Sequence, residues 1–101
     1  MPTHAGVIIH MAGIDWVVPP LSLGQVKRLK AMQDAVKTDL DNLDTMGQAV
    51  QMALSRNYPD ITLERVENDL LDAGNIKHVF EVVMGVSGMV AAAGEAGGAI
   101  P

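Results

Sequence analysis

The sequence contains no cysteine and very few aromatic residues. The absence of cysteine excludes disulfide bonds, thiolate ligands for zinc or iron–sulfur clusters, and a cysteine nucleophile, and it is compatible with a reducing compartment. Only Trp16, Tyr58 and Phe80 are aromatic, although hydrophobic residues make up 49% of the 101 residues. We therefore expect a globular protein whose core is built from leucine, valine, isoleucine, methionine and alanine.

Excess positive charge and long apolar segments are also missing. The chain has 7 lysine and arginine residues against 12 acidic ones, which gives a formal net charge of −5 at pH 7. Proteins that bind nucleic acid through phosphate contacts are normally basic, so nucleic acid is not an expected partner. No apolar run approaches the ~20 residues that cross a bilayer, and the N-terminus lacks the pattern of a secretory signal. We expect a soluble, intracellular protein that does not bind membranes.

The pattern of apolar residues predicts a β-hairpin at residues 7–18 followed by helices. β-Branched residues and Trp16 flank Gly13, which can adopt the positive φ of a tight turn. Pro19 and Pro20 then end the second strand, because proline has no N–H for strand pairing. Helical spacing of apolar residues predicts helices at about residues 22–37, 39–56, 62–73 and 75–84.

The ends of these helices carry recognisable capping residues. Ser22, Thr38 and Thr62 each precede a helical segment, where a hydroxyl group can accept a hydrogen bond from an unpaired backbone N–H. Gly74 is expected to adopt the left-handed conformation that ends the third helix. Asn75 is then expected to cap the fourth helix.

Apolar stripes predict which helix faces are buried. The first helix has the stripe Leu23, Val26, Leu29, Met32 and Val36, and the second has Leu40, Leu43, Met46 with Gly47, Val50, and Ala53 with Leu54. Gly47 costs about 1 kcal/mol relative to alanine inside a helix, so we expect another helix to approach it closely. The fourth helix has the stripe Ile76, Val79, Phe80 and Val83, in which Phe80 is expected to be the largest core residue.

The C-terminal residues have a different composition. After Gly85, glycine alternates with alanine, valine and methionine, and residues 91–101 have too little apolar area to offset the entropy of ordering them. We therefore expect a mainly α (α+β) fold. A single domain at residues 1–90 packs the N-terminal hairpin on about four short helices, and residues 91–101 form a flexible Gly/Ala-rich tail.

No group of residues has the spacing of a catalytic or metal site. His4, His10 and His78 are far apart, and no His-Glu-x-x-His pattern occurs. The acidic run at residues 39–44 does not fit a calcium loop, because Leu43 stands where an oxygen ligand is needed. The sequence predicts no enzymatic activity, no bound metal and no cofactor.

Two surfaces are candidate partner-binding sites. Methionine is frequent on surfaces that accept varied apolar partners. The four residues predicted to form an apolar docking patch near the glycine-rich segment are Met84, Val86, Met89 and Val90. The alternative interpretation is that each methionine fills a gap in the core. Off the apolar stripe of the first helix, Lys27, Arg28 and Lys30 are predicted to contact a charged client or neighbour.

Two longer segments are distinctive. The first is WVVPPLSLGQ at residues 16–25, with Lys27, Arg28 and Leu29 behind it. The second runs from NYPDIT at residues 57–62 through Leu70-Leu71-Asp72 and Asn75 to VVMGVSG at residues 82–88. Together with the hairpin before the two prolines, over about residues 7–90, they resemble the small tail assembly chaperones of long-tailed bacteriophages and prophages.

The resemblance implies a mostly helical protein that binds and solubilises the tape-measure protein, a long helical rod that aggregates easily. Polymerisation of the tail tube then displaces the chaperone. The resemblance also implies a location in the cytoplasm of the bacterial host and absence from the mature virion. The tail-tube protein and a frameshifted longer form of the chain are further candidate partners, and weak self-association is compatible with this function.

Two other functions remain alternatives. A structural component of the virion, such as a head–tail connector or a tail-terminator subunit, would form stable rings and be found in mature particles. A small enzyme or metal-binding module would contain a bound metal or a deep polar pocket. The family's motif designates no binding residues, so the two predicted surfaces rest on their side-chain chemistry alone.

Overall fold

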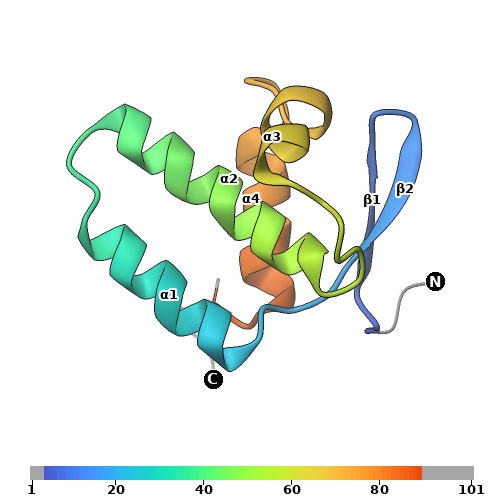
Figure 1. Cartoon of the computed structure of the whole chain (residues 1–101), viewed down its shortest axis with the longest axis horizontal. Helices are drawn as coiled ribbons and strands as arrows, with labels where there is room; N and C mark the ends of the chain where they lie inside the picture. The colour runs from blue at the N-terminus through green and yellow to red at the C-terminus, as the bar shows by residue number, and fades with distance from the viewer. Residues whose placement is uncertain (1–3, 90–101) are drawn as a thin grey trace.

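The chain forms a two-stranded antiparallel hairpin followed by helices in the computed structural model, which describes residues 4–89 (Figure 1). The elements in chain order are β1 (Val7–Met11), β2 (Ile14–Val18), α1 (Leu23–Asp34), α2 (Asp39–Ser55), α3 (Leu63–Arg65), the π-helical turn η1 (Val66–Leu70) and α4 (Ile76–Val86). This arrangement confirms the predicted α+β class. Val90 and the predicted tail at residues 91–101 lie outside the described residues.

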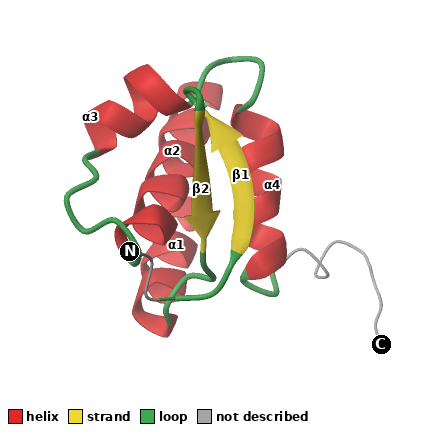
Figure 2. Ribbon diagram, turned by 90° about the vertical axis from the view of Figure 1, so that its right-hand side faces the viewer, coloured by secondary structure: helices red, strands yellow, loops and turns green. Residues whose placement is uncertain are grey.

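The hairpin has the short turn that the sequence predicts. Met11 pairs with Ile14, and the two residues between them, Ala12 and Gly13, have φ angles of 54° and 76°. Positive φ at both central positions is typical of the type I′ turn that matches the twist of paired strands. Figure 2 shows the hairpin lying against the helices, where β2 contacts α2 and β1 contacts α4. The buried residues of the hairpin are Ile9, Met11, Trp16 and Val18.

The segment after α2 fixes β2, the second strand of the hairpin. The backbone N–H of Val17 donates a hydrogen bond to the Tyr58 hydroxyl at 2.8 Å, and the Asn57 side-chain amide donates to the Val17 carbonyl at 3.1 Å. The rings of Trp16 and Tyr58 meet edge to face at a centroid distance of 4.9 Å. A hairpin is marginal alone in water, so these contacts and the apolar face of the hairpin hold it on the helices.

The predicted N-caps are confirmed. Ser22 accepts a hydrogen bond from the Gln25 N–H while the Gln25 side chain accepts from the Ser22 N–H, a reciprocal pair that satisfies two backbone donors. The Thr38 hydroxyl accepts from the Asp41 N–H, and the Thr62 hydroxyl accepts from the Arg65 N–H. These three caps set the first residues of α1, α2 and α3.

The predicted third helix, at residues 62–73, is shorter and less regular than expected. α3 spans only three residues and passes directly into η1, which the Leu71 N–H closes with a bond to the Val66 carbonyl at 2.9 Å. Leu71 itself has an extended backbone. The third helical segment therefore ends at Leu70.

Two predictions are wrong: Gly74 does not end the third helix in a left-handed conformation, and Asn75 does not cap the fourth. The Asp72 carboxylate accepts hydrogen bonds from the N–H groups of Gly74 and Asn75 at 2.8 and 2.9 Å, so the turn needs no left-handed glycine. The Asn75 side chain does not cap α4, because it instead accepts from the Asp72 N–H and donates to the Leu70 carbonyl. The side chains of Asp72 and Asn75 therefore stabilise a turn between η1 and α4.

The left-handed glycine of the helical region lies after α4. Gly88 has a φ of 76°, the Met89 N–H donates to the Met84 carbonyl at 2.8 Å, and the Gly88 N–H donates to the Gly85 carbonyl at 3.1 Å. This pair of bonds is the Schellman arrangement, which satisfies backbone carbonyls at the end of a helix. α4 consequently continues to Val86, beyond the predicted end at residue 84.

The core lies where α2, α4, η1 and the hairpin meet. α2 contributes its C-terminal half, in which Val50, Ala53 and Leu54 are fully buried. From α4, Val79 and Val83 are buried, whereas Phe80 packs against the core and stays partly exposed. Phe80 is therefore not the central core residue that the sequence predicts.

Candidate binding groove

The N-terminal half of α2 carries an apolar stripe that nothing in the described chain covers. Leu40 and Leu43 continue the face that buries Val50 and Leu54, yet their exposed fractions are 74% and 45%. Their predicted burial is wrong because α2 extends beyond the elements that pack on its C-terminal half. Within the described chain, no residue from Lys30 to Asp44 is buried. The end of α1, the connecting loop and the start of α2 thus form a tip that projects from the core (Figure 1).

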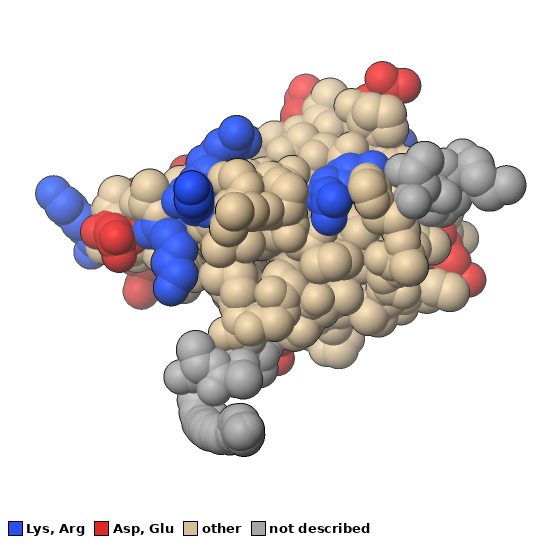
Figure 3. Space-filling view, turned by 90° about the horizontal axis from the view of Figure 1, so that it is seen from below, with Lys and Arg blue, Asp and Glu red and all other residues tan. Residues whose placement is uncertain are grey.

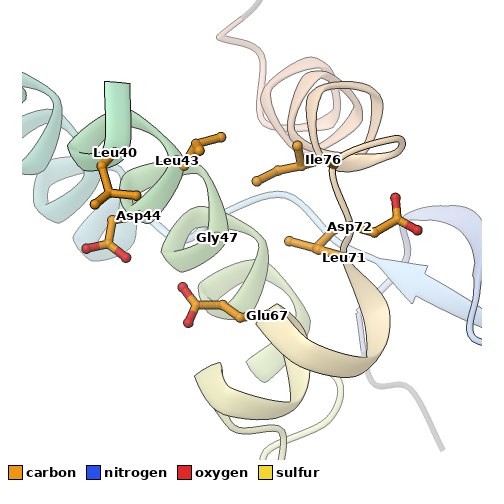
Figure 4. A pocket seen from close by; sticks show the side chains of 9 residues that line it. Leu40, Leu43, Asp44, Gly47, Glu67, Leu71, Asp72 and Ile76 are labelled. Atoms are coloured by element: carbon orange, nitrogen blue, oxygen red, sulfur yellow. The ribbon is translucent and has the colours of Figure 1, made fainter. Parts of the chain in front are cut away.

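An open groove of about 410 Å³ lies beside this exposed stripe (Figure 4). One wall is the N-terminal half of α2, and the other is formed by η1, the turn after it and the first residue of α4. The apolar lining residues are Leu40, Leu43, Gly47, Leu71, Ala73 and Ile76, and the acidic ones are Asp44, Glu67 and Asp72. The groove is therefore an apolar cleft between helical walls.

Gly47 and Glu67 form one end of the groove. A Cβ atom at Gly47 would lie 3.2 Å from the Glu67 carboxylate oxygen Oε2, so the Glu67 side chain lies against this point of α2. The close neighbour expected at Gly47 is thus a side chain from η1. Because π-helical turns are rare and frequently occur at functional sites, the position of η1 in the groove wall adds weight to this groove as a site.

The polar groups of the groove are all acidic. Within residues 4–89, neither Asp44 nor Glu67 is paired with a lysine, arginine or histidine, and the recorded ion pair joins His10 and Asp15 on the hairpin. Asp72 is already engaged by backbone N–H groups of its own turn. The groove therefore presents negative charge around an apolar floor.

The apolar patch predicted at the end of α4 faces the core more than the solvent. Met84 and Met89 are partly buried and pack against the hydrophobic core, and Val86 is also partly buried. These positions favour the alternative interpretation, in which the methionines fill gaps in the core. The fourth predicted residue, Val90, lies outside the described residues.

The predicted basic residues Lys27, Arg28 and Lys30 are exposed on α1 and do not line the groove. Figure 3 shows lysine and arginine side chains gathered on the side of the molecule that α1 forms. Arg28 also contacts α2, since its Nη1 atom lies 3.9 Å from the Met52 sulfur. The basic side chains of α1 thus lie apart from the groove, although acidic side chains are interspersed among the basic ones on this side of the molecule (Figure 3).

A smaller hollow of about 220 Å³ lies between α1 and α2. Its lining residues are Met32, Ala35, Val36, Asp41, Asp44, Thr45 and Gln48. It is more polar than the groove and shares only Asp44 with it. Both hollows border the same projecting tip, which identifies the tip as the least covered part of the described fold.

Among the described residues there is neither a side-chain cluster that could hold a metal ion nor a helix that could cross a membrane. Nowhere in residues 4–89 do three or more histidine, aspartate or glutamate side chains come together as a potential metal site. Every helix in this part of the chain falls short of the length and apolar character that a membrane crossing requires. His10 and Asp15 form an exposed pair at 2.8 Å across the hairpin, away from the groove.

The sequence carried no signal that locates the groove. The helices predicted at residues 22–37 and 39–56 are of similar length, whereas in the structure α1 has 12 residues and α2 has 17. The uncovered end of the α2 stripe becomes visible only in the folded chain. Comparison with known proteins adds no further guide, because no family model, curated protein or solved structure matches this chain.

Proposed function

We propose that this chain is a tail assembly chaperone of the kind found in long-tailed bacteriophages. It binds and solubilises the tape-measure protein during tail morphogenesis and is displaced as the tail tube polymerises. Two features support the proposal. One is the resemblance over about residues 7–90, and the other is an apolar groove that remains open in the folded chain.

The exposure of Leu40 and Leu43 in this groove is the observation that carries the proposal. A protein that shields an apolar helical rod needs a groove that accepts the apolar face of a helix, and it needs no catalytic group. Transfer of one fully exposed leucine out of water contributes about 1.5–3 kcal/mol. A contact that depends on two leucines is therefore weak.

Weak single contacts fit a chaperone that has to leave. Many copies bound along one rod hold it collectively, because each bound site raises the effective concentration of the others. Tail-tube subunits can then remove the copies one at a time. The proposal places the protein in the cytoplasm of the bacterial host and outside the mature virion, with the tail-tube protein and a frameshifted longer form as further candidate partners.

Co-expression with a tape-measure protein, a long helical tail protein, tests this function. We expect the long protein to be soluble and to co-purify with the chain when both are present, and to be insoluble alone. Full solubility of the long protein by itself would contradict the proposal. Mass spectrometry of purified virions distinguishes the chaperone from the alternative, a structural component of the virion. Recovery of the chain as a stoichiometric component would identify a connector or terminator subunit instead.

A further inference from the structure

The groove beside α2 restricts the shape of what it can bind. All of its lining residues belong to α2, η1, α4 and the turn before α4, so its walls offer side chains rather than the free edge of a β-sheet. An extended peptide would have no strand to pair with, whereas a helix can insert its apolar face. From Leu40 to Gly47 the α2 wall is two helical turns, about 10 Å long. The groove therefore fits a short stretch of helix.

The charges of the groove restrict the composition of that helix. Asp44 and Glu67 lie along the α2 wall, at one side of the apolar floor, without a cationic partner in the described chain, and the lining contains no lysine or arginine (Figure 4). An acidic or purely apolar occupant would bring these carboxylates against like charge or remove them from water without compensation. Lysine or arginine beside the apolar face of the occupant supplies opposite charge at both positions.

We propose that the groove binds a cationic amphipathic helix of a partner protein, with apolar residues spaced i, i+3 or i+4 and lysine or arginine beside that stripe. The inference rests on the proposed function and makes it more specific, because it states which segments of the tape-measure protein are recognised. Segments that combine apolar spacing with flanking positive charge bind, and acidic amphipathic segments of equal length do not.

A second copy of the chain is a poorer occupant. The outward face of α1 carries Leu23, Lys27 and Lys30 with helical spacing, which has the right charge. It offers only one exposed apolar side chain, however, because Leu29 is buried and Val26 is partly buried in the same molecule. The groove has two exposed leucines to cover, so an external helix with a full apolar stripe matches it better.

The test uses three labelled helical peptides of 20 residues in fluorescence anisotropy titrations with the whole protein. One has a leucine stripe flanked by lysine, the second has glutamate in place of each lysine, and the third has the composition of the first in scrambled order. We expect measurable binding of the lysine peptide alone, weakened several-fold when salt is raised from about 0.05 to 0.5 M because surface charges are then screened.

Four variants connect the binding to this groove. Leu40→Asp is expected to weaken binding of the lysine peptide about tenfold or more, because it removes an apolar contact and places a carboxylate where the leucine stripe of the peptide would exclude water from it. Leu23→Asp is the matched control, since Leu23 is 71% exposed against 74% for Leu40 and also lies in the first turn of a helix. It is expected to leave binding unchanged. Asp44→Asn and Glu67→Gln remove the charges and are expected to weaken binding several-fold with a smaller salt effect.

Three results would overturn the inference. The first is binding of the glutamate peptide as tightly as the lysine peptide. The second is an equal loss of affinity for the lysine peptide in Leu40→Asp and Leu23→Asp. The third is concentration-dependent self-association that Lys27→Glu and Lys30→Glu abolish, which would identify a second copy as the occupant. Circular dichroism of each variant verifies the fold, and the charge variants test the groove independently of Leu40.

The outcome also separates this inference from the proposed function. If the lysine peptide binds in the groove while the tape-measure protein ignores the chain, the function is wrong and the specificity of the groove stands. If the chain solubilises the tape-measure protein and the groove variants do so equally well, the function stands and the inference is wrong.

Discussion

Single side chains determine where the elements of this fold begin and how the hairpin is held. The three hydroxyl caps at Ser22, Thr38 and Thr62 could be predicted, because a cap depends on residues within three positions along the chain. The contact between Tyr58 and Val17 could not be predicted, because it joins residues 41 positions apart and depends on how α2 ends. The hydroxyl caps were visible in the sequence, whereas the turn built by Asp72 and Asn75 and the tertiary contacts were not.

The hydrogen bond to the Tyr58 hydroxyl can be tested by Tyr58→Phe. The substitution retains the ring contact with Trp16 but leaves the partly buried Val17 N–H without its partner. We expect a loss of about 1–2 kcal/mol in the free energy of unfolding, measured by urea denaturation. An unchanged transition midpoint would show that this bond does not hold the hairpin.

Replacing Gly88, which ends α4, by alanine is expected to change stability in the opposite direction to the same replacement at Gly24. Gly88→Ala forces a side chain into a φ of 76° and is expected to destabilise the protein by about 1 kcal/mol. Gly24 lies within α1 and has open space around its Cβ position, so Gly24→Ala is expected to stabilise the protein by up to about 1 kcal/mol. Thermal unfolding of both variants checks the pair, and shifts in the same direction would contradict the assignment of the cap.

At the scale of the elements, helical periodicity identified the apolar faces of α2 and α4 but not what covers them, and the burial that it predicts for Leu23 in α1 is wrong, because 71% of this residue is exposed. The stripe of α2 is continuous from Leu40 to Leu54, and only its second half lies in the core. The same pattern is produced by a buried helix and by a helix with a free binding surface. The irregular segment at η1 was also missed, because a π-helical turn has no apolar period of its own.

The projecting tip should be the least stable part of the helical region. Few buried apolar contacts hold residues 30–44, so their amide hydrogens are expected to exchange faster than those of residues 45–55, which contain the buried half of α2. Addition of the lysine peptide should slow exchange around residues 39–47, which form the groove wall. Hydrogen–deuterium exchange measured by mass spectrometry tests both statements, and protection confined to residues 84–89 would favour the patch at the end of α4 instead.

At the scale of the whole molecule, the fold class and the exposed basic residues of α1 were predictable, while the position of the candidate site was not. Composition predicted an acidic body with a core nearly free of aromatic residues, and Lys27, Arg28 and Lys30 are exposed on α1. The groove arises from three elements separated in sequence: the start of α2, η1 with its turn, and the start of α4. Only folding brings them together, so residue patterns within one helix could not reveal the site.

The most direct test of the central claim measures how much tape-measure protein stays soluble when it is co-expressed with three forms of this chain. The unmodified chain and Leu23→Asp are expected to keep it in the soluble fraction, because neither alters the groove. Leu40→Asp is expected to leave most of it in the pellet. Equal solubility with all three forms would contradict the claim that this groove is where the chaperone holds its client.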